Sequence, residues 1–396
     1  MRNEQDYFLR GNSFLYEEMQ PHFVIKWIEP IQREILQESV QEVIQRSPWV
    51  CWSLADRADA PKLLKAQGPF TVHDRYEKRA IPETPGGYLF SMSCENDTIH
   101  FVYDHFLTDG RGIVWLISAI LLAYCNRAYG TNTADIPLKS AQLPEFSELL
   151  KCASQNPHNE NITPLSKFDQ KAERLLLRID KKEMVQKAVS LEIKPFALLL
   201  SILCRGVMLA KKQMSVSYSY TLDARKGFDC ADVFYHFSTG VYNTVNAEGG
   251  IQGMQRHFHD MICRTAEPAV VRAHMAQGTR LLNDLAEMKI PHTTKRKVYQ
   301  KLSALERVTV RTSYLGNVFP QQYEILNRFV SDFILWLDSN HEEFLFLETT
   351  LRDQMIITLS HYADNATVAK CLLAALNESG IHGVQVCDGG KYGDGQ

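Results

Sequence analysis

The sequence contains one pattern twice, and this repeat constrains the fold more than any other feature. In the first copy, two short apolar runs flank a turn at Asp97, and His105 and a long apolar segment follow. In the second copy, a turn at Asp353, His361 and another helical segment stand at the same offset without a gap. We therefore expect two similar halves, each with a β-hairpin followed by a helix. The alternative is that any hairpin followed by a helix would give this likeness.

Composition places the chain among globular proteins. Its 396 residues are 45% hydrophobic and 22% charged, enough for two or three domains' worth of core. The formal net charge of -3 gives no sign of a nucleic-acid or membrane surface. No apolar run is long enough to span a bilayer, and the N-terminal residues lack a signal-peptide pattern, so we expect a cytoplasmic protein. The nine cysteines form no Cys-x-x-Cys pair, which indicates reduced core residues and no metal site.

Helix and strand patterns alternate along the chain, which is typical of an α/β fold. We expect an N-terminal subdomain over residues 1–150, a linker over residues 151–167 in a stretch rich in Pro, Asn and Ser, and a C-terminal subdomain over residues 168–385. Residues 386–396, rich in Gly and Asp, predict a disordered tail. A single long helical stretch is expected over residues 251–288.

The first copy carries the motif His-x-x-x-Asp-Gly, made by His105, Asp109 and Gly110, between a predicted strand and a predicted helix. Imidazole is the side chain best suited to take a proton near neutral pH. Asp109 could hold the loop through an ion pair, and Gly110 would let the chain turn sharply. The plain alternative is a surface histidine in a strand-to-helix turn. In the second copy Asn365 replaces the aspartate, so we interpret His361 as structural.

Three further stretches follow in order: Asp223-Ala224-Arg225 after a predicted strand, residues 238–244 (Ser-Thr-Gly-Val-Tyr-Asn-Thr) and residues 311–317 (Arg-Thr-Ser-Tyr-Leu-Gly-Asn). Together with the histidine motif, they resemble the chloramphenicol acetyltransferase-like superfamily, which includes peptide-synthetase condensation domains and alcohol acyltransferases. The resemblance covers residues 7 to 380. It implies an α/β fold of two similar subdomains, each a mixed β-sheet flanked by helices, with the active site in a tunnel between them.

The resemblance also implies a role for each residue of the motif. His105 is the general base that takes the proton of the acceptor hydroxyl or amine, with no acyl-enzyme. Asp109 is an anchor paired with Arg225, because the family pairs this aspartate with an arginine on a neighbouring strand. The alternative for Arg225 is a surface charge beside Lys226.

Other candidates come from the two later stretches. Ser313 and Thr312 are implied as donors to the oxyanion of the tetrahedral intermediate, although they could be ordinary strand hydroxyls. Gly240 and Asn243 would let a crossing segment approach the site, but they could equally be turn residues.

The sequence departs from the family pattern in two places. Asp104 stands where paired signatures have a first histidine, and Tyr314 follows Ser313 where Asn is common. The Asp-Phe-Gly-Trp-Gly motif of the plant branch is absent. In this family the second histidine of the pair is the catalytic one, so the change at residue 104 leaves the catalytic histidine, His105, in place. The change at Tyr314 leaves the substrate contacts of that strand undetermined.

The expected activity is acyl transfer from a coenzyme A thioester to the hydroxyl or amine of a small molecule. Acyl-coenzyme A would be a co-substrate, with no permanently bound cofactor and no metal. The alternatives are a condensation-type enzyme that takes its donor from an acyl carrier protein, and a family member without catalysis. Two fused halves can build a site between them in one chain, so a monomer is the simplest expectation. Neither the acceptor nor the acyl chain length follows from the sequence.

Overall fold

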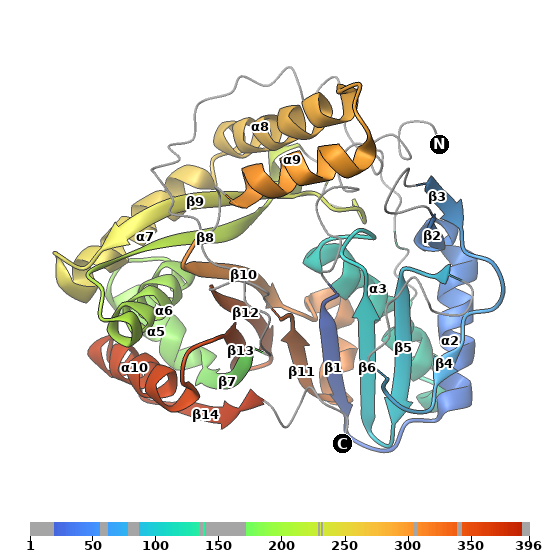
Figure 1. Cartoon of the computed structure of the whole chain (residues 1–396). Helices are drawn as coiled ribbons and strands as arrows, with labels where there is room; N and C mark the ends of the chain where they lie inside the picture. The colour runs from blue at the N-terminus through green and yellow to red at the C-terminus, as the bar shows by residue number, and fades with distance from the viewer. Residues whose placement is uncertain are drawn as a thin grey trace.

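The computed structural model describes residues 20–55, 62–77, 87–134, 138, 172–228, 230, 233–304, 308–338 and 343–389. The linker expected over residues 151–167 lies outside these ranges. Within them, the strands form two mixed sheets that lie next to each other, each flanked by helices (Figure 1). The expected α/β fold with two sheet-and-helix subdomains is confirmed.

The first sheet has the strand order β11-β1-β6-β5-β4. Its strands are β1 (His22–Trp27), β4 (Val72–His73), β5 (Phe90–Glu95), β6 (Thr98–Tyr103) and β11 (Val330–Trp336). The helices α2 (Arg33–Arg46) and α3 (Gly110–Tyr129) pack together behind this sheet (Figure 1). A two-stranded ribbon of β2 (Trp52–Ala55) and β3 (Lys62–Lys65) lies beside it. Helix α3 is apolar around most of its circumference because it is the central helix of this core.

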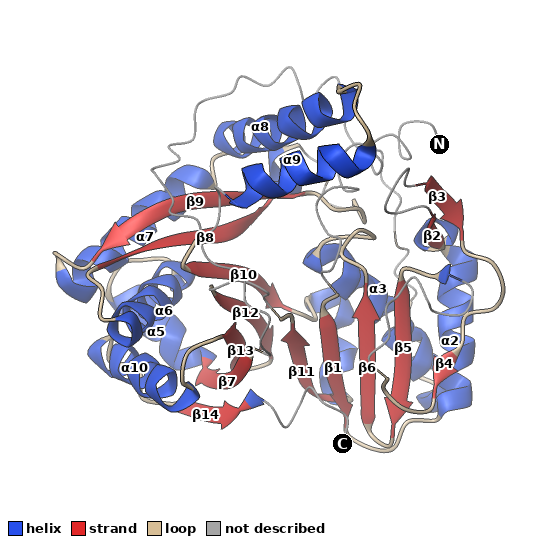
Figure 2. Ribbon diagram, in the orientation of Figure 1, coloured by secondary structure: helices blue, strands red, loops and turns tan. Residues whose placement is uncertain are grey.

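The second sheet has the strand order β14-β7-β13-β12-β10-β8-β9. Its strands are β7 (Glu173–Asp180), β8 (Ser215–Asp223), β9 (Ser238–Asn246), β10 (Val310–Asn317), β12 (Phe344–Leu351), β13 (Gln354–His361) and β14 (Val384–Asp388). Its outer face packs on α5 (Lys181–Ser190), α6 (Pro195–Lys211), α7 (Gly250–Thr265) and α10 (Asn365–Glu378) in a second hydrophobic core. The helices α8 (Pro268–Glu287) and α9 (His292–Ala304) lie across β8 and β9 at the top of Figure 2.

The internal repeat is visible in the backbone. Strands β5 and β6 form an antiparallel hairpin that precedes α3, and β12 and β13 form another that precedes α10. Each hairpin turn contains a residue in the left-handed region at the matching position, Asn96 and Arg352, both with φ of 53°. Each helix begins at a capping aspartate, although Asp364 stands one position earlier in its copy than Asp109 does in the first. The two copies therefore share turn geometry as well as residue spacing.

Strand β11 crosses between the two halves. The sequence places residues 330–336 inside the expected second subdomain, but β11 pairs antiparallel with β1 at the edge of the first sheet. Its neighbours on the other side belong to the second sheet, where Thr349 donates a hydrogen bond to the carbonyl of Phe333. Two ion pairs, Arg178–Asp332 and Arg174–Asp338, tie this region to β7. One strand of the C-terminal half thus belongs to the first sheet. The expected division of the chain into two subdomains at the linker is corrected at residues 330–336.

Two other expectations about element boundaries were wrong. The long helix expected over residues 251–288 is two helices, because α7 ends at Thr265 and Pro268 opens α8. Proline fits the first turn of a helix but not its interior. The tail expected from residue 386 begins inside β14, where Cys387 pairs with Leu176 of β7. Residues 390–396 lie outside the described part of the chain.

Within the described residues, α3 is the single continuous helix that is long and apolar enough to cross a membrane, by length and composition alone. Of its most apolar 18-residue window, 72% is buried inside the protein. Burial in the core of the first subdomain therefore accounts for its composition.

Candidate active site

The loop after β6 holds His105 in a tight, internally bonded turn. The backbone N–H of Asp104 donates to the carbonyl of Leu89, and the Asp104 carboxylate accepts from the N–H of Phe106 at 2.9 Å. The carbonyl of Asp104 accepts from the N–H of Leu107. Asp104 is 1% exposed. The aspartate that stands in place of the first histidine therefore shapes the turn, while the His105 side chain stays half-buried.

Asp109 connects this loop to both halves of the molecule. As the cap of α3 it accepts from the N–H groups of Arg111 and Gly112, at 3.1 and 3.0 Å. Its other carboxylate oxygen accepts from the N–H of Phe237 at 2.9 Å. Burial acts to raise the pKa of Asp109, but Arg225 and these donors hold that pKa well below its usual range. The carboxylate is therefore a fixed anion.

Arg225 pairs with Asp109 in a two-pronged geometry, with Nη1 and Nη2 at 2.9 and 3.0 Å from the two carboxylate oxygens. It also donates to the carbonyls of Val233 and Tyr235 and to Asp223. The side chain is 2% exposed. Asp223 accepts from both the backbone N–H and the Nη1 of Arg225. The Asp-x-Arg spacing therefore places a carboxylate where it binds the arginine side chain. The structure thus brings Asp109 and Arg225 together as a buried ion pair and excludes the surface alternative.

Glycine at positions 110 and 112 permits close packing. A Cβ atom at Gly110 would lie 2.4 Å from Cδ2 of Leu315 on β10, so the second sheet contacts the start of α3 here. A Cβ at Gly112 would lie 2.0 Å from both the carbonyl oxygen of Phe234 and Oγ1 of Thr108, two groups that hydrogen bond to each other. Gly110 does not adopt a positive φ. The expected reason for Gly110, a sharp turn, is therefore replaced by close contact with β10.

The His105 imidazole is neutral over the physiological range. Burial and the neighbouring His236 lower the pKa of His105 to about 3, while its own backbone and Asp109 act in the opposite direction. The ring centroids of His105 and His236 are 5.5 Å apart. Only the neutral form of an imidazole can accept a proton, so His105 is in the form that a base needs, and the lowered pKa also makes it a weaker base than a free imidazole.

His236 is the residue of this site that sequence reasoning missed. No sequence pattern singles out this histidine, yet it is 8% exposed and lies beside His105. The one available signal was its position, two residues before the stretch at residues 238–244 that resembles the family.

The remaining candidates lie on two strands of the second sheet, Thr312 and Ser313 on β10 and Gly240 and Asn243 on β9. Thr312 is 3% exposed and donates its hydroxyl to the carbonyl of Ser219 on β8. Because side chains alternate along a strand, Ser313 lies on the opposite face and is half-buried. Gly240 and Asn243 lie inside β9, opposite Thr221 and Tyr218 of β8. The alternative that they are turn residues was wrong.

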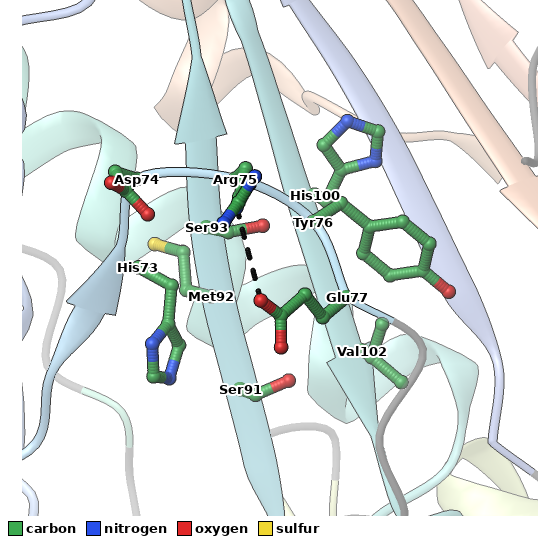
Figure 3. A pocket seen from close by; sticks show the side chains of 10 residues that line it. All are labelled: His73, Asp74, Arg75, Tyr76, Glu77, Ser91, Met92, Ser93, His100 and Val102. Carbon is green, nitrogen blue, oxygen red and sulfur yellow. Dashed lines mark ion pairs between the residues drawn. The ribbon is translucent and has the colours of Figure 1, made fainter. Parts of the chain in front are cut away.

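A hollow lies on the first sheet and is not lined by His105. It has a volume of about 120 Å³ and is closed by the segment after β4 (Figure 3). Tyr76 stacks on His22 and on His100, with ring centroids 4.4 and 4.9 Å apart, and the two imidazoles share a hydrogen bond of 3.0 Å. Arg75 and Glu77 form an exposed ion pair at its rim. Among the described residues, no group of three or more His, Cys, Asp or Glu side chains is arranged to bind a metal.

No family model and no curated protein matches the sequence. Solved structures do match the fold over almost the whole chain. Polyketide synthase associated protein 5 from Mycobacterium tuberculosis aligns with a TM-score of 0.64 at 12% identity, over 93% of this chain and 96% of that one. This match agrees with the fold that the resemblance implies. The chain has the fold of the chloramphenicol acetyltransferase-like superfamily.

Two other solved structures that match the fold have different names. F. sporotrichioides TRI101, complexed with coenzyme A and T-2, aligns with a TM-score of 0.62 at 9% identity, over 96% of this chain and 98% of that one. The epimerization domain from the third module of tyrocidine synthetase B aligns with a TM-score of 0.59 at 11% identity, over 95% and 94% of the two chains. Identities this low establish the chloramphenicol acetyltransferase-like fold and leave the reaction to be argued from the site.

Buried neutral histidines predict that the fold is sensitive to acid. Burial lowers the pKa of His361 and of His100 to about 4, against an ordinary value near 6.5. The unfolded chain therefore binds more protons than the native one below pH 6.5, and the free energy of unfolding falls as the pH drops from 6.5 towards 4. Each such group contributes up to about 1.4 kcal/mol per pH unit.

Urea unfolding of the wild type and of His361→Phe at several pH values tests this expectation. The imidazole of His361 is fully buried and stacks on Phe344, so the variant loses its titration and keeps a ring. The free energy of unfolding of the wild type minus that of His361→Phe should decrease as the pH falls from 6.5 to 4.5, because only the wild type carries this titrating group. A difference that stays constant over this pH range would contradict the assignment, and His382→Gln, at an exposed histidine, is the matched control for the substitution itself.

Proposed function

We propose that this protein is an acyltransferase that moves an acyl group from a coenzyme A thioester to the hydroxyl or amine of a small molecule. The observation that supports this most directly is a neutral imidazole, His105, on a loop that the Asp109–Arg225 pair fixes where the two sheets meet. In the resemblance drawn from the sequence, the same histidine is the base. The matching TRI101 structure holds coenzyme A, which supports this class of donor.

The reaction needs one proton to move twice. The ring of His105 takes the proton of the acceptor as its oxygen or nitrogen attacks the thioester carbonyl. A tetrahedral intermediate with an oxyanion forms, and we assign Ser313 on β10 as a donor to this charge, as the resemblance implies. Collapse of the intermediate breaks the C–S bond, and His105 returns the proton to the leaving thiolate. The products are an ester or amide and free coenzyme A.

Asp109 has no direct part in this proton transfer. Its two carboxylate oxygens accept hydrogen bonds from Arg225, Phe237, Arg111 and Gly112, so its charge is already fully engaged. Its part is to hold the His105 loop on α3. We keep the expectations of a cytoplasmic monomer and of a site between the two sheets as part of this proposal.

Thiol release from acetyl-, butyryl-, octanoyl- and palmitoyl-coenzyme A, with pooled alcohols and amines as acceptors, tests the proposal. Acceptor-dependent release is expected with at least one donor. His105→Ala should lower it by about 10²- to 10⁴-fold with an unchanged melting temperature, because a positioned general base contributes about that much. The exposed His382→Ala is the matched control and should keep full activity.

The same measurement separates the two alternatives. Activity with pantetheine-linked donors on an acyl carrier protein, but with no free coenzyme A thioester, would point to a condensation-type enzyme. No release with either kind of donor, from a protein shown to be folded, would overturn the acyltransferase assignment.

A further inference from the structure

One residue of strand β10 lies outside the regular pairing of the second sheet. Tyr314 stands opposite Glu348 of β12, and two residues later Gly316 stands opposite the next residue of β12. Leu315, between them, has no residue opposite it on β12 and forms a β-bulge. Gly316 has a φ of 69°, in the left-handed region that glycine occupies without strain. The bulge therefore sets where the side chains of Tyr314 and Leu315 lie.

The bulge is also the part of β10 that contacts both halves of the molecule. The ring of Tyr314 packs on Phe196 of α6, with centroids 4.9 Å apart. Leu315 packs against the core of the first subdomain, and its Cδ2 lies 2.4 Å from where a Cβ of Gly110 would be. Gly110 is the first residue of α3 and the last residue of the motif that begins at His105. A shift of the bulge would therefore change the contact that the second sheet makes beside the His105 loop.

The carboxyl group of Glu348 binds the backbone of this bulge from inside the second sheet. Its Oε2 accepts from the N–H of Gly316 at 3.3 Å, and its Oε1 accepts from Oγ1 of Thr350 at 2.6 Å. Glu348 is 3% exposed. Burial raises the pKa of Glu348 to about 7, while these two donors and Lys181 act to lower it. Burying a carboxyl group is unfavourable unless hydrogen bonds compensate for the lost water, and here the compensating bonds are those to the bulge and to Thr350.

We propose that Glu348 is a positioning residue of the active site. By accepting the N–H of Gly316 it holds the β10 bulge, and the bulge in turn holds Leu315 against Gly110 at the start of α3. Ser313, two residues before Leu315, is held on the same segment. This inference rests on the proposed acyltransferase function. Glu348 takes no part in the proton transfer, and its carboxyl group acts on the reaction only through β10.

Two variants of Glu348 separate the hydrogen bond from the volume of the side chain. Glu348→Leu is similar in size and has no acceptor. Glu348→Gln keeps an oxygen for the N–H of Gly316, and its amide can donate to the hydroxyl of Thr350. In the thiol-release assay, the kcat of Glu348→Leu should fall about 10- to 100-fold, because a displacement near 1 Å in a catalytic group can cost about 10²-fold in rate. The KM values for donor and acceptor should stay within about twofold, and Glu348→Gln should keep at least about a third of the wild-type kcat.

Two further variants control for stability. Thr358→Val, on β13, removes a buried hydroxyl that donates to the carbonyl of Leu335, and β12 separates β13 from β10. It should lower the melting temperature and leave kcat unchanged. Thr350→Val is a milder test of the bulge, because it removes only the hydroxyl that orients the carboxyl group of Glu348. Its kcat should fall about 3- to 10-fold, in line with the loss of one hydrogen bond, and it is the deciding variant if Glu348→Leu does not fold.

The results distinguish the role of Glu348 from the proposed function. The positioning role is wrong, and the proposed function stands, if Glu348→Leu is folded with the kcat of the wild type, or if it is unfolded and Thr350→Val has that kcat. Equal kcat losses in the Leu and Gln variants, a loss confined to KM, or an equal kcat loss in Thr358→Val would show a general structural effect and overturn the inference. If the folded wild type transfers no acyl group to any acceptor, the proposed function fails and this inference fails with it.

Discussion

Replacing Arg225 by methionine should lower the free energy of unfolding by about 3–5 kcal/mol, the usual cost of removing one partner from a buried ion pair. Asp109 would remain 4% exposed with its main cation gone, and the carbonyls of Val233 and Tyr235 would each lose a donor. Globular domains are stable by only about 5–15 kcal/mol, so this loss is a large part of the total. Chemical denaturation of the purified variant measures it.

The pH dependence of the loss identifies its cause. In the wild type Arg225 holds the pKa of Asp109 low, so the carboxylate contributes to stability above pH 4 and that contribution is lost only in acid. Without Arg225, burial raises the pKa of this carboxyl above its unfolded value, and protonation then relieves the unpaired charge. The difference between Arg225→Met and wild type should therefore be smaller at pH 5 than at pH 8.

An exposed ion pair supplies the control for this experiment. Lys182 and Asp353 lie 2.8 Å apart, but their side chains are 68% and 64% exposed. Lys182→Met should cost less than about 1 kcal/mol, because solvent screens such a pair. If Arg225→Met were no more destabilising than Lys182→Met, the pair would not be what holds the histidine loop.

The features that could be predicted from the sequence are mostly local. Each hairpin needs only a turn between two short strands, and the equal offset of the two copies follows from counting residues. The pairing of Asp109 with Arg225 joins residues 116 positions apart, and it was expected only because the sequence resembles a family in which this pair occurs. Composition and periodicity alone could not have supplied it.

The missed features depend on contacts between distant segments. Residues 22–27 form the inner strand β1, and five of the six are buried, so the alternation that identifies a half-exposed strand is absent. The partner of β11 is chosen across the two halves, and nothing within residues 330–336 selects β1 over a strand of the second sheet. The contacts of His236 and Gly112 depend on a segment that folds back over α3. No local sequence pattern predicts these contacts.

Gly112→Ala should be among the most damaging single-methyl additions in the described part of the chain. The new Cβ would lie 2.0 Å from the carbonyl oxygen of Phe234 and from Oγ1 of Thr108. One of these atoms is backbone, and the same segment carries Tyr235 and Phe237, whose bonds to Arg225 and Asp109 resist movement. The methyl group therefore has to separate α3 from the loop at residues 233–237.

We expect Gly112→Ala to lower the free energy of unfolding by about 1–3 kcal/mol or more, as overpacking of a dense core does. Acyl transfer should fall more than tenfold even at temperatures where the variant is folded, since a displacement near 1 Å in a catalytic group can cost about 10²-fold in rate. Gly253→Ala is the matched control, because Gly253 also lies within a helix but no atom lies within 4 Å of its added Cβ. That variant should be stabilised by about 0.5–1 kcal/mol, the helix preference for Ala over Gly. If the two variants shifted stability in the same direction, the close approach of α3 to residue 234 would not be a constraint on the site.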